Sequence, residues 1–279
     1  FTVEDNEYAL TEDITLTTVY ITPETRLVDL TCVLNINPCS FWNDKIVYYD
    51  QRKGPDGYRT IYMYDLNTKT EINIPTREGP SARVIYHGDK IVYIMGKGKT
   101  EDGNIYRQDD IYMYDLSRDK EVQITNDSRC SYRMAFYGDT IVWDDYEYII
   151  SGKQFPSPDI YMFNLSDGRE TKITSAPEFM GAWPQIYGDK VVCWGYKSGV
   201  DDIYMHDLST GKAIQITKDG YFQTKPAIYK DKIAWEDFRS ARDTKSDIYA
   251  YDFTSGEEIP ITTAVGIQQY PKIYEDKIV

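Results

Sequence analysis

Aspartates recur at one fixed place in the repeats of this 279-residue chain, and that place limits the chemistry they can do. Each ends a strand and precedes a polar turn, so we interpret them as turn residues that accept hydrogen bonds from backbone donors. The set is Asp65, Asp115, Asp207 and Asp252. Adjacent acids, Asp144 with Asp145 and Asp201 with Asp202, offer oxygen ligands for Ca²⁺. No D-x-D-x-D-G loop accompanies them, so the sequence predicts no metal site.

Other catalytic signatures are scarce. Only two histidines occur, His87 and His206, and His206 takes a strand position where other repeats carry Tyr or Phe. We interpret it as a filler of apolar space and not as a ligand. Neither the sialidase pattern S-x-D-x-G-x-T-W nor the hydrolase elbow G-x-S-x-G is present. We therefore expect a protein without enzymatic activity, catalytic residues or a cofactor.

Four cysteines bear on the redox compartment. Cys32 and Cys39 flank a short segment and form a candidate disulfide if the protein is exported. Cys193 takes the place that Trp143 and Trp235 hold in equivalent strands, so we expect a buried free thiol.

Charge and hydropathy exclude several classes of partner. The formal net charge is −14 and the pI is near 4.6, which disfavours capture of nucleic acid or an anionic membrane. No apolar run approaches the roughly 18 residues of a membrane span, so direct membrane insertion is not expected. The chain begins at Phe1. We expect an extracellular or cell-surface protein whose signal peptide has been removed.

Internal repetition is the strongest signal in the sequence. The string DIYMYDL at Asp110 recurs as DIYMFNL at Asp159, DIYMHDL at Asp202 and DIYAYDF at Asp247, with TIYMYDL from Thr60 as a fifth copy. A Thr follows each of the four aspartates at a constant offset of 15 residues, which predicts a hairpin of fixed register. A second signature, such as IYGDKVVCW, precedes each copy, and its turn aspartates are Asp44, Asp89, Asp139, Asp189, Asp231 and Asp276.

Each unit predicts four strands, which we name a to d in chain order. In one unit they are Pro226 to Tyr229, Lys232 to Glu236, Asp247 to Asp252 and Glu258 to Thr262. Strands a and b are joined by a tight two-residue turn, and strands c and d by a polar turn. Repeated units of four short antiparallel strands are typical of a β-propeller.

The repeat count predicts a six-bladed β-propeller of four-stranded antiparallel blades. Six a–b hairpins but five clear c–d hairpins occur, so we expect Glu7 to Thr22 to supply the missing strands to a last blade begun at the C-terminus. The alternatives are seven blades, or a fragment of a longer chain. As one domain, 1–279, the expected blades are 38–76, 82–125, 134–174, 184–217, 226–262, and 271–279 plus 7–22.

The pattern Y-G-D-K-I-V-W, D-I-Y-M-Y-D-L-S-T-G-K, Q-I-T resembles the TolB-type, WD40-like propeller repeats of archaeal cell-surface and surface-layer proteins. It extends over most of the chain, from about Asn37 to Val279. The resemblance implies an exported protein that binds other macromolecules or forms part of an envelope. The repeat is a scaffold used by many proteins, so it is specific for the fold and not for a function.

The b–c and d–a connections carry all the length variation, and variable loops on a rigid scaffold are the usual place for binding. Aromatic rings beside basic residues at that end could stack on sugars or anchor a protein partner. We expect the binding surface to draw on these residues: Tyr58, Arg59, Tyr106, Arg107, Arg129, Tyr132, Arg133, Phe179, Trp183, Tyr221, Phe222, Phe238, Arg239, Arg242 and Tyr270.

Three functions are therefore weighed. The leading hypothesis is a non-enzymatic cell-surface propeller that recognises a protein or glycan through the b–c and d–a loop face. The second is a carbohydrate-active enzyme, a lyase or glycosidase, that uses loop-face carboxylates. The third is a structural module that self-associates in a surface-layer array.

Overall fold

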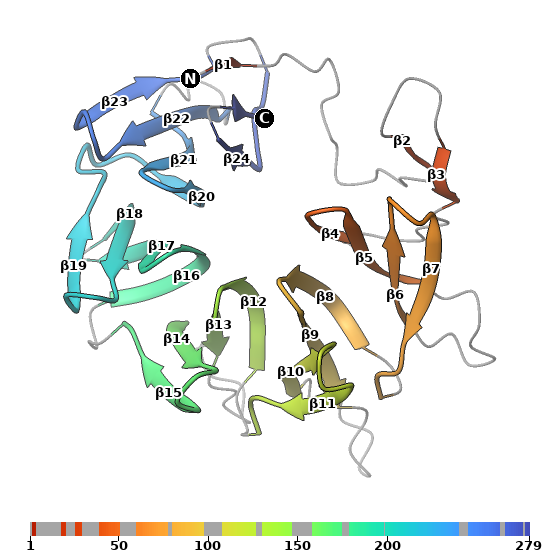
Figure 1. The fold of residues 1–279 in the computed structure, drawn as a ribbon. Coiled ribbons are helices and arrows are strands. Elements are labelled where there is room, and N and C mark those ends of the chain that lie inside the picture. The colour runs from red at the N-terminus through yellow and green to blue at the C-terminus, as the bar shows by residue number, and fades with distance from the viewer. Residues whose placement is uncertain are drawn as a thin grey trace, which may run out of the picture. The chain divides into compact units, whose positions relative to one another are not determined.

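The computed structural model describes residues 2–3, 18–20, 26–29, 39–50, 60–77, 80–97, 108–126, 130–146, 158–174, 179–197, 199–239, 245–262, 266–275 and 277–279. Within these ranges the chain forms only strands and turns (Figure 1). No helix in the described ranges has the length and apolarity needed to cross a membrane. The chain divides into two compact units, Leu10–Ser131 and a second formed by Phe1–Ala9 with Tyr132–Val279.

The unit Leu10–Ser131 contains a two-stranded hairpin and two four-stranded antiparallel sheets. The hairpin pairs β2 (Thr18–Tyr20) with β3 (Arg26–Asp29). The first sheet is β4 (Cys39–Trp42), β5 (Lys45–Asp50), β6 (Thr60–Asp65) and β7 (Thr70–Ile74). The second is β8 (Pro80–His87), β9 (Lys90–Lys97), β10 (Gln108–Asp115) and β11 (Lys120–Gln123).

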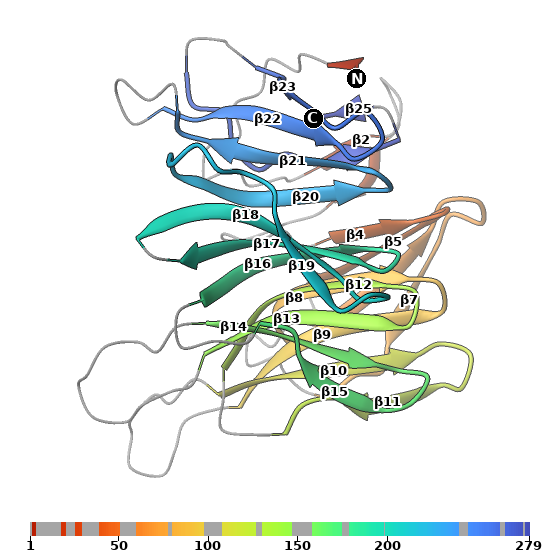
Figure 2. The same cartoon turned by 90° about the vertical axis from the view of Figure 1, so that its left-hand side faces the viewer.

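The other unit holds three further four-stranded sheets, whose strands follow one another in chain order (Figure 2). The first is β12 (Cys130–Tyr137, which begins at the unit boundary), β13 (Thr140–Tyr146), β14 (Asp159–Asn164) and β15 (Arg169–Lys172). The second is β16 (Phe179–Tyr187), β17 (Lys190–Lys197), β18 (Val200–Asp207) and β19 (Lys212–Gln215). The third is β20 (Gln223–Tyr229), β21 (Lys232–Asp237), β22 (Asp247–Asp252) and β23 (Glu257–Pro260).

The predicted four-strand repeat is confirmed in all five of these sheets. The second and third strands of each sheet carry most of its buried apolar residues, because both of their faces are covered. In β21, for example, Ile233, Ala234 and Trp235 are fully buried. The fourth strand is largely exposed to solvent, as β23 shows, where three of four residues are exposed. The apolar core of each unit therefore lies along the middle strands of its sheets.

The recurrent turn aspartates have the role that the sequence predicted. Oδ1 of Asp65 accepts the backbone N–H groups of Asn67 at 2.9 Å and Thr68 at 3.0 Å. These backbone donors and Lys45 lower the pKa of Asp65 to about 2. The same pattern of bonds occurs at Asp115, Asp207 and Asp252.

The last sheet differs from the prediction. It has three strands in the described residues, β24 (Ile273–Tyr274), β25 (Lys277–Ile278) and β1 (Thr2–Val3), and β1 pairs in parallel with β25. The N-terminus thus adds to the C-terminal sheet, but through Thr2–Val3. Of the segment Glu7 to Thr22, the described part pairs as β2 with β3. A partner a few residues away costs less loop-closure entropy than one at the far end of the chain. The rest of that segment lies outside the described residues.

Candidate functional site

A row of alternating basic and aromatic side chains runs over the first strands of three successive sheets and the segment before β24, in the unit that contains Tyr132–Val279. We call it the cation–aromatic ladder, and its members are Arg133, Trp183, Lys225 and Tyr270. Arg133 lies in β12, Trp183 in β16 and Lys225 in β20, while Tyr270 precedes β24. Each stands six residues before the aspartate of its a–b turn.

The four side chains are in contact along the ladder. The Arg133 guanidinium carbon lies 4.0 Å from the centre of the Trp183 ring. The Lys225 ammonium lies 5.7 Å from the same ring and 3.7 Å from the centre of the Tyr270 ring. The Trp183 and Tyr270 rings are 6.4 Å apart and tilted by 55°. Lys225 is therefore held between two aromatic rings, at distances where cation–π attraction operates.

The backbone is unusual at three of the four positions. Trp183, Lys225 and Tyr270 have φ values of 56°, 50° and 59°, in the left-handed region that side chains with a Cβ avoid. Each is followed by a proline, which further restricts the preceding residue. A bulge interrupts the pairing of β16 with β17 and of β20 with β21 at the same place. Bulges and left-handed residues redirect side chains, and such strain gathers at functional sites.

Two buried carboxylates, Asp144 and Glu236, accept hydrogen bonds from the backbone of the ladder. Asp144 accepts the backbone N–H groups of Arg133 at 2.7 Å and Trp183 at 3.1 Å, and its Oδ2 lies 3.1 Å from Nη1 of Arg133. Glu236 accepts the backbone N–H of Tyr270 at 2.7 Å, and its Oε1 lies 3.2 Å from the Lys225 ammonium. Both carboxylates have no exposed surface.

Burial raises the pKa of Asp144 and of Glu236 above the ordinary carboxyl values. The adjacent Arg133 and Lys225 act in the opposite direction but do not outweigh the loss of water. The two cations of the ladder are thus matched by two carboxylates. We interpret Asp144 and Glu236 as positioning residues, because both carboxylates are buried and each accepts hydrogen bonds from residues of the ladder itself.

A second aromatic group lies where the chain enters β20 and leaves β21. The Phe222 and Phe238 rings are 4.9 Å apart, and the Phe238 N–H donates to the Phe222 carbonyl at 3.0 Å. Phe222 is 42% exposed and the adjacent Tyr221 is 51% exposed. We call Tyr221, Phe222 and Phe238 the aromatic platform.

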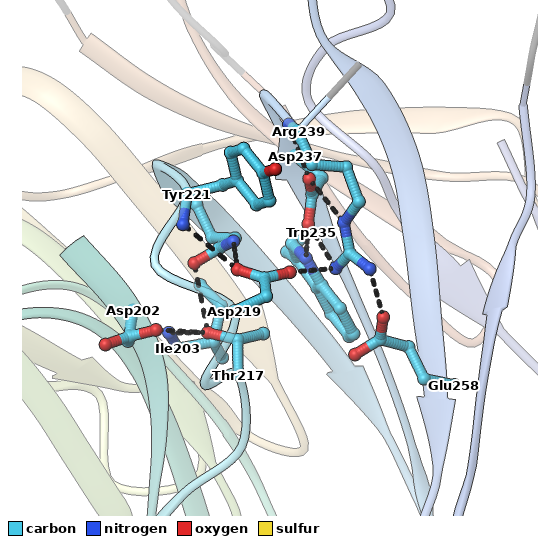
Figure 3. A network of polar contacts seen from close by, with 10 residues as sticks. Asp202, Ile203, Thr217, Asp219, Tyr221, Trp235, Asp237, Arg239 and Glu258 are labelled. Carbon is cyan, nitrogen blue, oxygen red and sulfur yellow. Dashed lines mark hydrogen bonds and ion pairs between the residues drawn. The ribbon is translucent and has the colours of Figure 1, made fainter. Parts of the chain in front are cut away.

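A polar network underlies the aromatic platform, and Figure 3 shows Arg239 between three carboxylates. Its guanidinium lies 2.7 Å from Asp237, 2.8 Å from Asp219 and 2.6 Å from Glu258. Burial alone would lower the pKa of Arg239, but hydrogen bonds to Asp237 and Glu258 outweigh it and raise the pKa. Arg239, expected on the binding surface, is thus used to fix this loop.

Asp219 connects the network to the platform. It accepts the backbone N–H of Tyr221 at 3.1 Å and the side-chain amide of Gln223 at 2.6 Å. Gln223 in turn accepts the hydroxyl of Thr217 at 3.1 Å (Figure 3). The exposed rings of Tyr221 and Phe222 therefore project from a loop whose backbone is fixed by hydrogen bonds.

The structure brings together only part of the predicted surface. Arg133, Trp183 and Tyr270 meet in the ladder, while Tyr221, Phe222 and Phe238 form the platform. The side chains of Tyr132 and Phe179, and all of Tyr58, Arg59, Tyr106, Arg107, Arg129 and Arg242, lie outside the described residues. Arg133 and Trp183 were expected in loops but lie in strands, because β12 and β16 begin earlier than predicted.

Lys225, Asp144 and Glu236 were not predicted as parts of a binding site. The available signal was spacing: Lys225 stands six residues before its turn aspartate, and both acids stand five residues after theirs. Asp144 and Asp202, which belong to the acidic pairs considered as Ca²⁺ ligands, have other partners in the structure. Asp144 is bonded to Arg133 and Trp183, and Asp202 accepts hydrogen bonds from Thr217 and Gln215. The described residues contain no group of three or more His, Cys, Asp or Glu side chains suited to a metal ion.

Cys193 and the two histidines, which the sequence analysis also considered, lie in strands of the sheets. Cys193 is a free, fully buried thiol, as predicted, and burial raises its pKa to about 12. His206 lies in β18 and burial lowers its pKa. His87 ends β8 with its ring 3.8 Å from that of Trp42, and burial lowers its pKa as well. The proposed bridge between Cys32 and Cys39 lies outside what the structure describes.

Comparison with solved structures gives the class of fold. TolB from Acinetobacter baumannii matches with a TM-score of 0.56 and 17% identity over 88% of this chain and 58% of that one. The β-propeller domain of the Trilobed protease from Pyrococcus furiosus matches with 0.59 and 17% over 83% and 70%. An acylaminoacyl peptidase from Pyrococcus horikoshii matches with 0.61 and 17% over 83% and 39%.

The chain therefore has the fold of a TolB-like β-propeller, built from four-stranded antiparallel blades, and its sheets are consistent with six blades. It spans 58% of the length of the TolB chain and 39% of the peptidase. No protein-family model and no curated protein matches the sequence.

Proposed function

We propose that this chain is a non-enzymatic binding propeller that recognises a protein or glycan through the cation–aromatic ladder and the aromatic platform. The observation that carries the proposal is the left-handed backbone at Trp183, Lys225 and Tyr270. Each such position costs of the order of 1–2 kcal/mol. Three of them at equivalent places, joined into one row of rings and cations, support a role beyond packing.

The chemistry of the ladder supports binding in preference to catalysis. Its carboxylates are buried beneath the row and accept hydrogen bonds from the residues that form it. An acid–base pair for glycoside cleavage needs carboxylates that reach the substrate. Rigid aromatic groups with polar neighbours are typical of sites that anchor partners with little loss of conformational entropy.

A cell-surface or extracellular location is part of this proposal. It is supported by the resemblance of the repeats to those of archaeal surface-layer proteins, and by Asn126, which starts the acceptor tripeptide Asn-Asp-Ser and is exposed. Impermeant labelling of intact cells that express the full gene tests this location. Labelling only after lysis would contradict it.

Glycan and peptide arrays test the function directly. The wild-type protein is compared with Tyr270→Ala and Phe222→Ala, two substitutions of exposed rings that leave the buried carboxylates intact. We expect ligands that bind the wild type and bind both variants more weakly. Product analysis of every positive spot then separates the classes: an unchanged ligand supports binding, and a cleaved one contradicts the proposal in favour of a carbohydrate-active enzyme.

Self-association in an envelope array is tested separately, by sedimentation of the wild-type protein over a range of concentrations. Concentration-dependent assembly that persists in the Tyr270→Ala variant would favour the structural role over ligand binding.

A further inference from the structure

Among the described residues, the cation–aromatic ladder ends on the ring of Tyr270, and we call this the open end of the ladder. From Arg133 the order is cation, ring, cation, ring, and the first ring, Trp183, contacts both the preceding and the following cation. Tyr270 has the Lys225 ammonium 3.7 Å from its centre on one side, and the residue is 40% exposed. The next position in the alternation is therefore accessible to a group that the chain does not supply among its described residues.

We propose that the open end of the ladder at Tyr270 binds a lysine or arginine side chain of a basic protein partner. The inference rests on the proposed binding function and names the class of partner. A cation placed on the exposed side of the Tyr270 ring would continue the alternation that the ladder already shows.

Charge favours this occupant over an acidic one. The chain has a formal net charge of −14, which draws basic partners at long range and repels acidic ones. Close to the site, the cations of Arg133 and Lys225 are already paired with Asp144 and Glu236, so neither is left uncompensated to attract an anion.

Glu236 adds a second, independent observation. Its Oε1 accepts the Tyr270 N–H and contacts Lys225, while its Oε2 is buried and has no hydrogen-bond partner. A buried carboxylate oxygen without a donor costs free energy. An additional positive charge near Tyr270 would reduce this cost, because it would stabilise the ionised form of a carboxylate that is bonded to the Tyr270 backbone.

The test uses labelled hexalysine and hexa-arginine peptides, with a hexaglutamate peptide as the charge-reversed probe, in a fluorescence anisotropy titration. Tyr270→Leu removes the ring, and Tyr270→Phe keeps its π face. Tyr274→Leu is the matched control, since Tyr274 lies four residues away and is 66% exposed. Thermal unfolding of each variant verifies that it is folded.

We expect Tyr270→Leu to weaken binding of the basic peptides about two- to fivefold, the range of an exposed cation–π contact. Tyr270→Phe and Tyr274→Leu should bind like the wild type. The inference would be overturned if Tyr270→Leu bound the basic peptides as tightly as the wild type does. It would also be overturned if Tyr274→Leu lost as much affinity as Tyr270→Leu, or if the wild type preferred hexaglutamate. A neutral oligosaccharide that depends on Tyr270 while the basic peptides do not bind would also overturn it, but would leave the proposed binding function intact.

Discussion

The hydroxyl of Thr217 donates to Oδ1 of Asp202 at 3.0 Å, across the interval of 15 residues that recurs in the sequence, and Oε1 of Gln223 shares the same proton. The same oxygen of Thr217 accepts the backbone N–H of Ile203 at 2.9 Å. Equivalent bonds join Thr125 to Asp110 and Thr174 to Asp159. In these three sheets one threonine, just after the fourth strand, is bonded to the start of the third strand, which explains why the spacing is constant.

Replacing Thr217 with Val should destabilise the protein by about 1–3 kcal/mol, because the buried N–H of Ile203 loses its acceptor in a side chain of equal size. Urea unfolding measures the change. Thr254→Val, in an exposed turn, serves as the control and should change stability by less than about 0.5 kcal/mol. Equal effects at the two positions would show that the bond to Ile203 contributes nothing specific.

The left-handed backbone of Lys225 predicts an inverted order of stability between two truncations. Lys225→Gly and Lys225→Ala both remove the contacts with Trp183 and Tyr270, but only Ala keeps a Cβ at a φ of 50°. We expect the Gly variant to be more stable than the Ala variant by about 1 kcal/mol, whereas Ala is the better residue in most strands. Denaturant midpoints decide, and a more stable Ala variant would exclude strain at this position.

The contact between Lys225 and Tyr270 can be measured by a double-mutant cycle. With Lys225→Met and Tyr270→Leu we expect a coupling free energy of about 0.5–1 kcal/mol in favour of the pair. Lys212, at the start of the exposed outer strand β19, provides the control cycle with Tyr270, for which the coupling should be near zero. A vanishing value for Lys225 would mean that the ladder is a geometric coincidence.

The raised pKa of Glu236 makes a signed prediction for pH. Burial makes the folded state hold this proton more tightly than the unfolded chain does. Stability contributed by Glu236 therefore increases as pH falls from the raised pKa toward the ordinary carboxyl value, and is lost as pH rises through that window. The stability of the wild type relative to Glu236→Gln should shift in this direction across weakly acidic pH. A difference that is flat, or that grows with rising pH, would contradict the assignment.

Cys193 should be chemically inert until the protein unfolds. Its thiol is fully buried and its pKa is raised to about 12, so almost no thiolate is exposed at neutral pH. We expect the peptide that contains Cys193 to be labelled by an alkylating reagent in denaturant and not in buffer, as read by mass spectrometry. Rapid labelling of the folded protein would place the thiol at the surface.

Much of the sheet structure could be predicted from the sequence because each strand carries its own signal. The apolar runs before Asp115 and Asp207 identify buried third strands, and the turn aspartates identify where they end. The constant spacing of Asp202 and Thr217 indicated a fixed register, although the sequence alone did not show the hydrogen bond behind it.

The ladder was harder to predict because its parts lie in separate repeats. Trp183 and Tyr270 are recognisable as aromatic residues near predicted loops, whereas a lone lysine such as Lys225 resembles any solvated residue. The contact between them depends on left-handed residues before Pro184, Pro226 and Pro271, and a sequence does not reveal such a conformation at a residue other than glycine. The ion pairs of Arg239 were equally hard to predict, because its three carboxylates are distributed over one loop and two strands.

In each of the five four-stranded sheets, the short turn between the first and second strands is also bonded to the residue that follows the third strand. The carbonyl of Asp189 accepts the backbone N–H of Leu208, and Asp44, Asp89, Asp139 and Asp231 do the same for Leu66, Leu116, Leu165 and Phe253. Each of these bonds begins and ends within one repeat. A gene segment that encodes one repeat can therefore be duplicated or deleted without removing this hydrogen bond from any other repeat. We expect this independence to let such proteins gain or lose whole repeats during evolution.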